Sequence, residues 1–149
     1  MTDVEKAVIS SDIIVVLKTN GDVISWGRAG FIGDGSTEDN FTPTTIASNA
    51  RDIEAGQKTC AYISNDDELY LWGSNTENMI GDGSDEGVLY PKEIMENVKS
   101  VSMGSVITLC STNDGKYYGW GWAMASQLGE SNRGAVKEPL ELEISNMIS

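Results

Sequence analysis

Short apolar stretches with the pattern of β-strands recur along the chain. Ile13 to Lys18, Thr59 to Ser64 and Ile107 to Thr112 are rich in β-branched and apolar residues. Their length and composition favour strands over helices. The spacing between them is nearly constant, which indicates that one structural unit is repeated.

A turn signal follows each stretch, and a second predicted strand follows each turn. Asn-Gly and Asp-Gly sequences tolerate the positive φ that tight hairpins need. We therefore predict one antiparallel hairpin in each unit. The turns are Asn20-Gly21-Asp22, Asn65-Asp66-Asp67 and Asn113-Asp114-Gly115, and the second strands are Val23 to Trp26, Leu69 to Trp72 and Lys116 to Trp120.

The hairpins belong to a longer repeat that is visible by comparing the chain with itself. A Trp-Gly pair ends each predicted hairpin, a glycine-rich loop follows, and a proline comes later at a fixed distance. A glycine also lies sixteen residues before the second and the third tryptophan, and Ser10 lies at this position in the first copy. The repeated positions are Trp26, Trp72 and Trp120; Ile32-Gly33-Asp34-Gly35, Ile80-Gly81-Asp82-Gly83 and the weaker Leu128-Gly129-Glu130; Pro43, Pro91 and Pro139; and Gly56 and Gly104.

Four short antiparallel strands are predicted in each repeat. Besides the hairpin, one strand lies near the proline and one near Ile53 or Val101. Proline suits an outer strand, where its missing N–H faces solvent, and four such strands describe one propeller blade. We predict an all-β chain of three four-stranded antiparallel blades forming a partial β-propeller. Residues 1–149 form a single repeat domain, with repeats at about 4–47, 48–95 and 96–145.

These motifs together resemble the repeat of the regulator of chromosome condensation family, in its bacterial form. The resemblance covers three copies and implies propeller blades in a family whose members usually have seven. It also implies a loop-bearing face that binds another protein. Known roles in the family include nucleotide exchange on a small GTPase, inhibition of a β-lactamase and ultraviolet sensing. The chain departs from the pattern in having Ile13, Thr59 and Ile107 where the family often has histidine, and in a shorter first loop.

Charge and hydropathy exclude some classes of partner. Ten basic and twenty-three acidic residues give a net charge of −13, which repels nucleic acids and anionic membranes. No apolar run approaches the roughly 20 residues of a membrane span. The first residues lack the pattern of a signal peptide, and the compartment stays open.

The residue inventory argues against an enzyme, a cofactor or a metal site. The chain has no histidine, and Cys60 and Cys110 lie in strand-like stretches where buried free thiols are expected. Acidic residues do gather in the Gly-Asp-Gly loops, which raises the possibility of calcium. Turn formation explains them without an ion, and the spacing does not match an EF-hand. The two groups are Asp34, Glu38 and Asp39, and Asp82, Asp85 and Glu86.

Repeated and variable positions are expected to have different roles. We assign the repeated residues to the scaffold and the variable residues after each tryptophan to partner binding, because readout positions differ between copies of a repeat. Trp122 stands out because Arg28 and Ser74 take its place in the other copies. The scaffold residues are Trp26, Trp72, Trp120, Gly33, Gly81, Gly129, Gly56 and Gly104; the partner-binding residues are Arg28, Phe31, Asn75, Asn78, Met79, Trp122 and Met124.

Two functions remain open. The first is a non-catalytic protein–protein interaction module with a protein partner. The alternative is a purely structural propeller segment that completes a ring or stalk in a larger protein. For assembly, we predict a homodimer in which blade three of each chain packs on blade one of the other, closing a six-bladed ring. The competing interpretation is a fragment of a seven-bladed propeller.

Overall fold

Three four-stranded antiparallel sheets make up the described part of the protein. The computed structural model describes residues 1–28, 31–123 and 134–143. Blade 1 comprises β1 (Val4–Ser10), β2 (Ile13–Lys18), β3 (Val23–Gly27) and β4 (Asn40–Ala47). Blade 2 comprises β5 (Ala50–Ala55), β6 (Thr59–Ser64), β7 (Leu69–Gly73) and β8 (Val88–Met95). Blade 3 comprises β9 (Val98–Met103), β10 (Ile107–Thr112), β11 (Tyr117–Ala123) and β12 (Gly134–Leu142).

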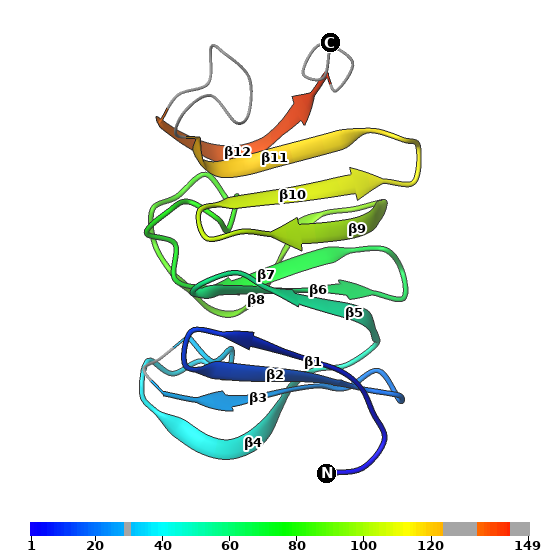
Figure 1. Ribbon diagram of the computed structural model, residues 1–149, viewed down its shortest axis with the longest axis vertical. Helices are drawn as coiled ribbons and strands as arrows, with labels where there is room; N and C mark the ends of the chain where they lie inside the picture. The colour runs from blue at the N-terminus through cyan, green and yellow to red at the C-terminus, as the bar shows by residue number, and fades with distance from the viewer. Residues whose placement is uncertain (29–30, 124–133, 144–149) are drawn as a thin grey trace.

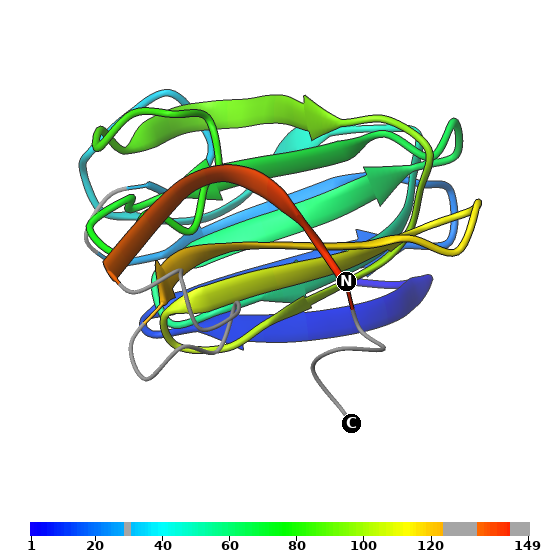
Figure 2. The same ribbon diagram turned by 90° about the horizontal axis from the view of Figure 1, so that it is seen from above.

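The blades are stacked along the long axis of the molecule (Figure 1). Seen from above, the three sheets lie one behind another (Figure 2). Within each blade the strands follow chain order, and β1, β5 and β9 form one row of neighbouring edges. The predicted all-β fold of three four-stranded blades is confirmed. No helix in the described residues is long and apolar enough to cross a membrane.

Proline lies in the edge strand at the far side of each blade, as the sequence predicts. Pro43, Pro91 and Pro139 lie in β4, β8 and β12, each of which pairs with only one neighbouring strand. An edge strand has N–H groups with no ladder partner, so a residue without an N–H costs little there. The prolines therefore mark the outer rim of the blades.

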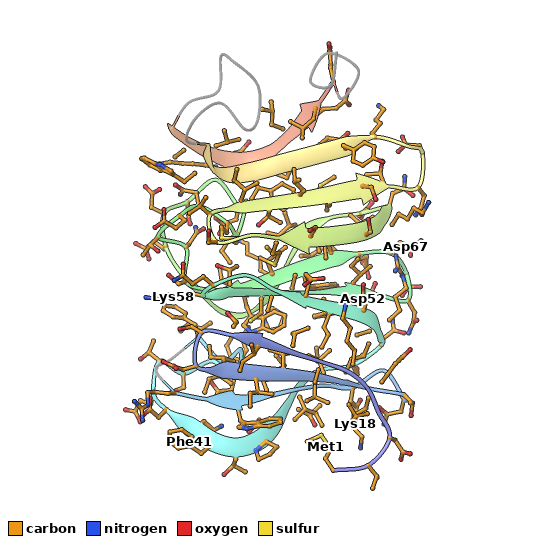
Figure 3. All side chains as sticks on the ribbon, in the orientation of Figure 1. Met1, Lys18, Phe41, Asp52, Lys58 and Asp67 are labelled. Carbon is orange, nitrogen blue, oxygen red and sulfur yellow. The ribbon has the colours of Figure 1, made fainter. Side chains whose placement is uncertain are left out.

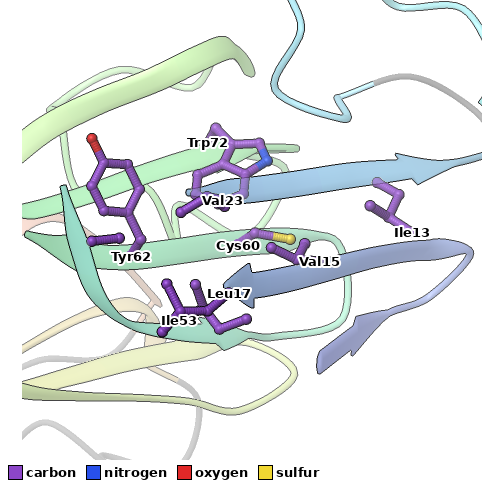
Figure 4. Packing of buried hydrophobic residues seen from close by; sticks show 9 residues of the cluster. Ile13, Val15, Leu17, Val23, Ile53, Cys60, Tyr62 and Trp72 are labelled. Atoms are coloured by element: carbon purple, nitrogen blue, oxygen red, sulfur yellow. The ribbon is translucent and has the colours of Figure 1, made fainter. Parts of the chain in front are cut away.

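The hydrophobic core lies between blades. Val15, Leu17 and Val23 of blade 1 pack against Trp72 and Tyr62 of blade 2, and each is less than a tenth exposed (Figure 4). The opposite face of blade 2 packs on blade 3 in a second cluster. Each blade thus buries an apolar face only where it has a neighbour. The second cluster contains Ala61, Ile63, Leu69, Leu71, Ile80, Val98, Val101, Cys110 and Trp120.

The glycine after each tryptophan is required by a close approach of two backbones. Gly27, Gly73 and Gly121 have φ values of 147°, 116° and 119°. A Cβ at these positions would lie 2.2, 2.5 and 2.3 Å from the carbonyl oxygens of the residues directly before β2, β6 and β10. Only glycine fits such space with positive φ, which explains the repeated Trp-Gly pair.

Candidate functional site

Two of the repeated tryptophans, Trp72 and Trp120, join their blades to the loop of the preceding blade. The Trp72 indole Nε1–H donates to the Ile32 carbonyl oxygen at 3.1 Å, and the Trp120 Nε1–H donates to that of Met79 at 2.8 Å. Both side chains are fully buried. The tryptophan position is therefore an inter-blade contact as well as a core position.

The glycines of the Gly-Asp-Gly loops make room for these indoles. A Cβ on Gly33 would lie 2.9 Å from Trp72 Nε1, and a Cβ on Gly81 would lie 2.6 Å from Trp120 Nε1. The second glycine of each motif bonds the outer strand of the next blade, through Gly35 N–H to Leu89 O at 3.0 Å and Gly83 N–H to Lys137 O at 2.8 Å. The motif is thus a clasp between neighbouring blades.

The aspartate between these glycines organises its own loop. Asp34 Oδ1 and Asp82 Oδ1 each accept a backbone N–H, from Ser36 and Ser84, at 3.0 Å. Burial alone would raise the pKa of Asp82, but the Ser84 hydrogen bonds and the Lys92 ammonium more than offset it, so that the pKa lies below its ordinary value. Within the described residues, no three His, Cys, Asp or Glu side chains gather as a metal site.

Trp26 differs from its two counterparts, although the sequence assigns all three tryptophans to the scaffold. Its side chain is partly exposed. Trp72 and Trp120 are covered by the loop of the blade before them, whereas the described residues place no blade before blade 1. The indole N–H of Trp26 has no acceptor among the described residues. The open face of blade 1 thus carries an unused copy of the inter-blade contact.

Gly56 and Gly104, between the first and second strands of blades 2 and 3, shape a tight connection. Gly56 N–H donates to Thr59 O at 2.8 Å, and Gly104 N–H donates to Ile107 O at 2.9 Å. A Cβ on Gly56 would lie 2.7 Å from the Gly104 carbonyl oxygen, so the connections of blades 2 and 3 touch. Gly129 and Met124, which the sequence also singles out, lie outside the described residues.

One backbone position holds a different side chain in each blade. The N–H groups of Arg28, Ser74 and Trp122 donate to the carbonyl oxygens that precede β2, β6 and β10, at 3.1, 3.0 and 2.8 Å. These three residues, which we call the variable row, follow the Trp-Gly pair at the loop side of the blades. Arg28 is exposed, and the Trp122 side chain is 37% exposed. The fold fixes the position of this row but leaves its chemistry free.

A cavity of about 270 Å³ opens beside the variable row, between blades 1 and 2. A second cavity of about 230 Å³ lies between blades 2 and 3, and both include Lys58 and Ser74. In Figure 3, Lys58 lies at the loop side of the molecule. The first cavity, here the blade 1–2 cavity, is lined by Ser10, Ser11, Asp12, Ile13, Arg28, Phe31, Lys58 and Ser74.

Phe31 forms a wall of the blade 1–2 cavity and reaches toward blade 2. A Cβ on Gly87 would lie 2.4 Å from the Phe31 ring, so the ring lies directly against that glycine. Phe31 is half-buried and has a φ of 58°. Its position joins the two loops that border the cavity, while part of the ring stays open to solvent.

Three residues expected to contact a partner are instead buried. Asn75, Asn78 and Met79 are 2%, 4% and 1% exposed. Both asparagine amides donate to the Ser84 carbonyl oxygen, at 2.7 and 3.3 Å, and Asn75 Oδ1 accepts the N–H of Ile80 at 3.1 Å. These hydrogen bonds are internal to the blade 2 loop, so the residues hold this loop in place and offer a partner little surface.

The sequence analysis did not single out Lys58 or Asp12 as members of the site, and it named Ser74 only as the counterpart of Trp122. Asp12, Lys58 and Val106 occupy equivalent positions directly before β2, β6 and β10, and their carbonyl oxygens accept the N–H groups of the variable row. The sequence could have identified Asp12 and Lys58 in the same way as the variable row, because Asp12, Lys58 and Val106 also differ between repeats. They were missed because only the residues after each tryptophan were compared.

The two thiols are poorly suited to chemistry at this site. Burial raises the pKa of Cys60 to about 12, although the Ser10 hydroxyl beside it lowers it slightly. Burial likewise raises the pKa of Cys110 to about 12. A thiolate is the reactive form, so neither cysteine is activated as a nucleophile.

Comparison with known proteins agrees with the repeat analysis. A family model for the regulator of chromosome condensation (RCC1) repeat matches residues 66–111. Human WBSCR16 has a TM-score of 0.84 at 19% identity over 97% of this chain. Prp20p from Saccharomyces cerevisiae has a TM-score of 0.81 at 22% identity over 95% of it, and yeast RCC1 (Prp20) bound to Kap60 has 0.79 at 20% over 95%. The chain spans 39%, 38% and 37% of those chains. The matched repeat and the shared fold confirm the resemblance seen in the sequence: the chain carries a regulator of chromosome condensation repeat on a β-propeller fold.

Proposed function

We propose that this protein is a non-catalytic protein–protein interaction module whose binding face is the loop side of its blades. The variable row and the blade 1–2 cavity form that face. Arg28, Phe31 and Trp122, all expected to bind a partner, have exposed or half-exposed side chains there. Arg28 and Phe31 line the cavity, and Trp122 holds the same backbone position in blade 3.

The variable row is the observation that carries the proposal. The same backbone hydrogen bond recurs in all three blades at this position, so the scaffold does not require a particular side chain there. Arginine, serine and tryptophan differ as much as side chains can in charge and size. Arginine and tryptophan are also enriched among residues that dominate binding energy at interfaces. A fixed backbone with free side chains suits recognition.

Structural relatives support binding as a use of this fold. The yeast Prp20p structure is described with its binding properties to Gsp1p and histones, and yeast RCC1 (Prp20) has been solved bound to Kap60. These partners belong to the yeast protein. For this chain, the fold supports the class of function, and its own variable row determines the partner.

Affinity capture with matched variants tests this proposal. The immobilised chain is incubated with extract of its source organism, beside Arg28→Ala with Trp122→Ala and a control of Lys18→Ala with Tyr90→Ala. Lys18 lies at the opposite end of the strands from Lys58, and Tyr90 is 65% exposed on outer strand β8 (Figure 3). We expect a captured protein to be lost with the first pair and kept with the control. Equal capture by all three contradicts the proposal.

We also propose that the chain forms a homodimer through the two end faces of the three-bladed stack. The open face of blade 1 carries Ile9, which is 67% exposed, together with Ile14 and the partly exposed Trp26. The far face of blade 3 carries Leu109 and Tyr117, which are 40% and 47% exposed. Apolar faces of this kind are covered within the stack, and a second copy supplies the matching surface at both ends.

Backbone groups at the two ends are complementary. Ala50 N–H donates to Gly21 O at 3.0 Å across the first blade interface, and Val98 N–H donates to Asp67 O at 2.9 Å across the second. The equivalent donor in blade 1 is Val4, and the equivalent turn residue in blade 3 is Gly115. A second copy placed like the next blade brings this donor and this acceptor together.

Side-chain charge supports the same arrangement. Arg51 of blade 2 donates to the carbonyl oxygens of Val98 and Lys99 in blade 3, at 2.8 and 3.1 Å. Lys99 is the equivalent of Arg51 in blade 3, and Glu5 is its equivalent in blade 1. In the dimer, Lys99 of one copy lies beside Glu5 of the other, with opposite charges.

Light scattering behind a sizing column tests the dimer. We expect a single species of twice 16.1 kDa. Trp26→Arg should convert it to a monomer that keeps its circular dichroism spectrum, whereas Trp122→Arg should leave the dimer intact. A stable wild-type monomer at micromolar concentration contradicts the dimer and favours a segment that joins further blades.

A further inference from the structure

The basic side chains of this acidic protein divide into those that form ion pairs and those that do not. Five of the described lysines and arginines form ion pairs with carboxylates. Arg28 and Lys58 form none with the described residues, and both line the blade 1–2 cavity. Lys18 and Lys99 are also without an ion pair to the described residues, but neither lines this cavity, where Arg28 and Lys58 meet in a chain with a net charge of −13. The paired residues are Lys6, Arg51, Lys92, Lys116 and Lys137.

A buried hydroxyl is a second, independent feature of the cavity. Ser10 lines it and is 0% exposed, and its Oγ lies beside the Cys60 thiol without a regular hydrogen-bond partner among the described residues. Ser25 Oγ, which does not line the cavity, likewise has no partner in the described part of the chain. A buried polar atom without a regular partner is costly, and a bound water or ligand can supply the missing hydrogen bond. Ser11 and Ser74 add further hydroxyl groups to the lining.

The size and walls of the cavity suit one or two side chains of a protein. Its volume of about 270 Å³ lies below the roughly 300–1,000 Å³ that is usual for small-molecule sites. Phe31 and Ile13 supply apolar wall, and Asp12 is the one carboxylate in the lining. One acidic side chain with an apolar neighbour fills such a space.

We propose that the blade 1–2 cavity binds an acidic segment of the partner protein, with Arg28 and Lys58 holding a carboxylate and Phe31 contacting the apolar residue beside it. Hydrogen bonds between a cation and a carboxylate are among the stronger polar contacts, and the arginine fork can bind both oxygens at once. The net charge of the protein repels an acidic segment at long range. Binding therefore depends on direct contacts with the Arg28 and Lys58 side chains, because the overall negative electrostatic field of the protein does not attract the segment.

This inference rests on the proposed function and names the chemistry of the partner at the same face. The probe is a fluorescein-labelled, capped peptide of alternating aspartate and leucine, measured by fluorescence anisotropy. Two control peptides, the asparagine twin and the lysine twin, have the same sequence with asparagine or lysine in place of each aspartate. We expect the acidic peptide to bind at least about tenfold more tightly than the asparagine twin, because a bond to a charged group is worth about 1.5–3 kcal/mol.

Matched variants separate the cavity from general charge effects. Arg28→Gln and Lys58→Gln should each weaken the acidic peptide about tenfold. Lys18→Gln removes the same charge at the opposite end of the strands and should change the affinity less than about twofold. Equal binding of the asparagine twin, tighter binding of the lysine twin, or an equal loss with Lys18→Gln each overturns the inference. A captured partner that still depends on Trp122 then leaves the proposed function standing.

Discussion

Replacement of Trp72 by alanine tests whether the repeated tryptophans hold neighbouring blades together. The side chain is fully buried between blades 1 and 2, its ring lies 6.3 Å from that of Tyr62, and its indole N–H bonds the Ile32 carbonyl oxygen. Truncation of a buried tryptophan costs about 3–5 kcal/mol, and the orphaned carbonyl adds about 1 kcal/mol or more. The loss is a large fraction of the roughly 5–15 kcal/mol by which domains are stable.

Thermal unfolding followed by circular dichroism measures this loss. For a chain of this size, each kcal/mol lowers Tm by about 2–4 °C, so Trp72→Ala should lower it by at least about 6 °C. Trp122→Ala is the control, because it removes the same side chain from an exposed position and should cost less than about 0.5 kcal/mol. A Tm for Trp72→Ala within about 2 °C of wild type refutes the inter-blade role.

Three further predictions concern the clasp between blades and the buried thiols. Gly81→Ala should destabilise the protein more than Gly115→Ala, because both glycines have positive φ but only Gly81 faces a neighbouring indole. Urea unfolding measures both variants, and equal losses of stability contradict the role of Gly81 as a clasp between blades. Asp82→Asn should lower the stability of the protein at pH 7 and have little effect at low pH. The pKa of Asp82 in the folded protein lies below its ordinary value of 3.8, so the ionised carboxylate contributes stability above that pH, and the contribution disappears as the pH falls through the folded-state pKa. A difference in urea unfolding that does not depend on pH argues against this. Cys60 and Cys110 should react with Ellman's reagent at pH 8 only in denaturant, and rapid reaction of the native protein disproves their burial.

The fold could be predicted from the sequence because the same structural requirements recur in each of the three blades. A strand such as Thr59 to Ser64 has the composition of a buried strand, and the turn after it has the residues that positive φ requires. Repeated residues such as Trp72, Gly73 and Gly81 each proved to serve a contact within or between blades. Repetition distinguishes such contacts from chance, so strands, turns and edge prolines could all be read in advance.

The site was less accessible because exposure and pairing depend on neighbours that a single repeat does not reveal. Trp26 has the same motif as Trp72, yet only a preceding blade makes that position buried. Asn75 varies between repeats for a reason internal to its loop. Lys58 gains meaning only because Arg28 lies at the same cavity and neither forms an ion pair with the described residues.

Amide hydrogen exchange on the chain in complex with its captured partner tests the central claim most directly. The account predicts that exchange slows at the loop side of the blades, in the segments around Ser11, Arg28, Lys58 and Trp122. Outer strands β4 and β8, at the rim, should exchange as in the free protein. Slowing confined to the rim strands, with the loop side unchanged, would contradict the claim that the variable row and the blade 1–2 cavity form the binding face.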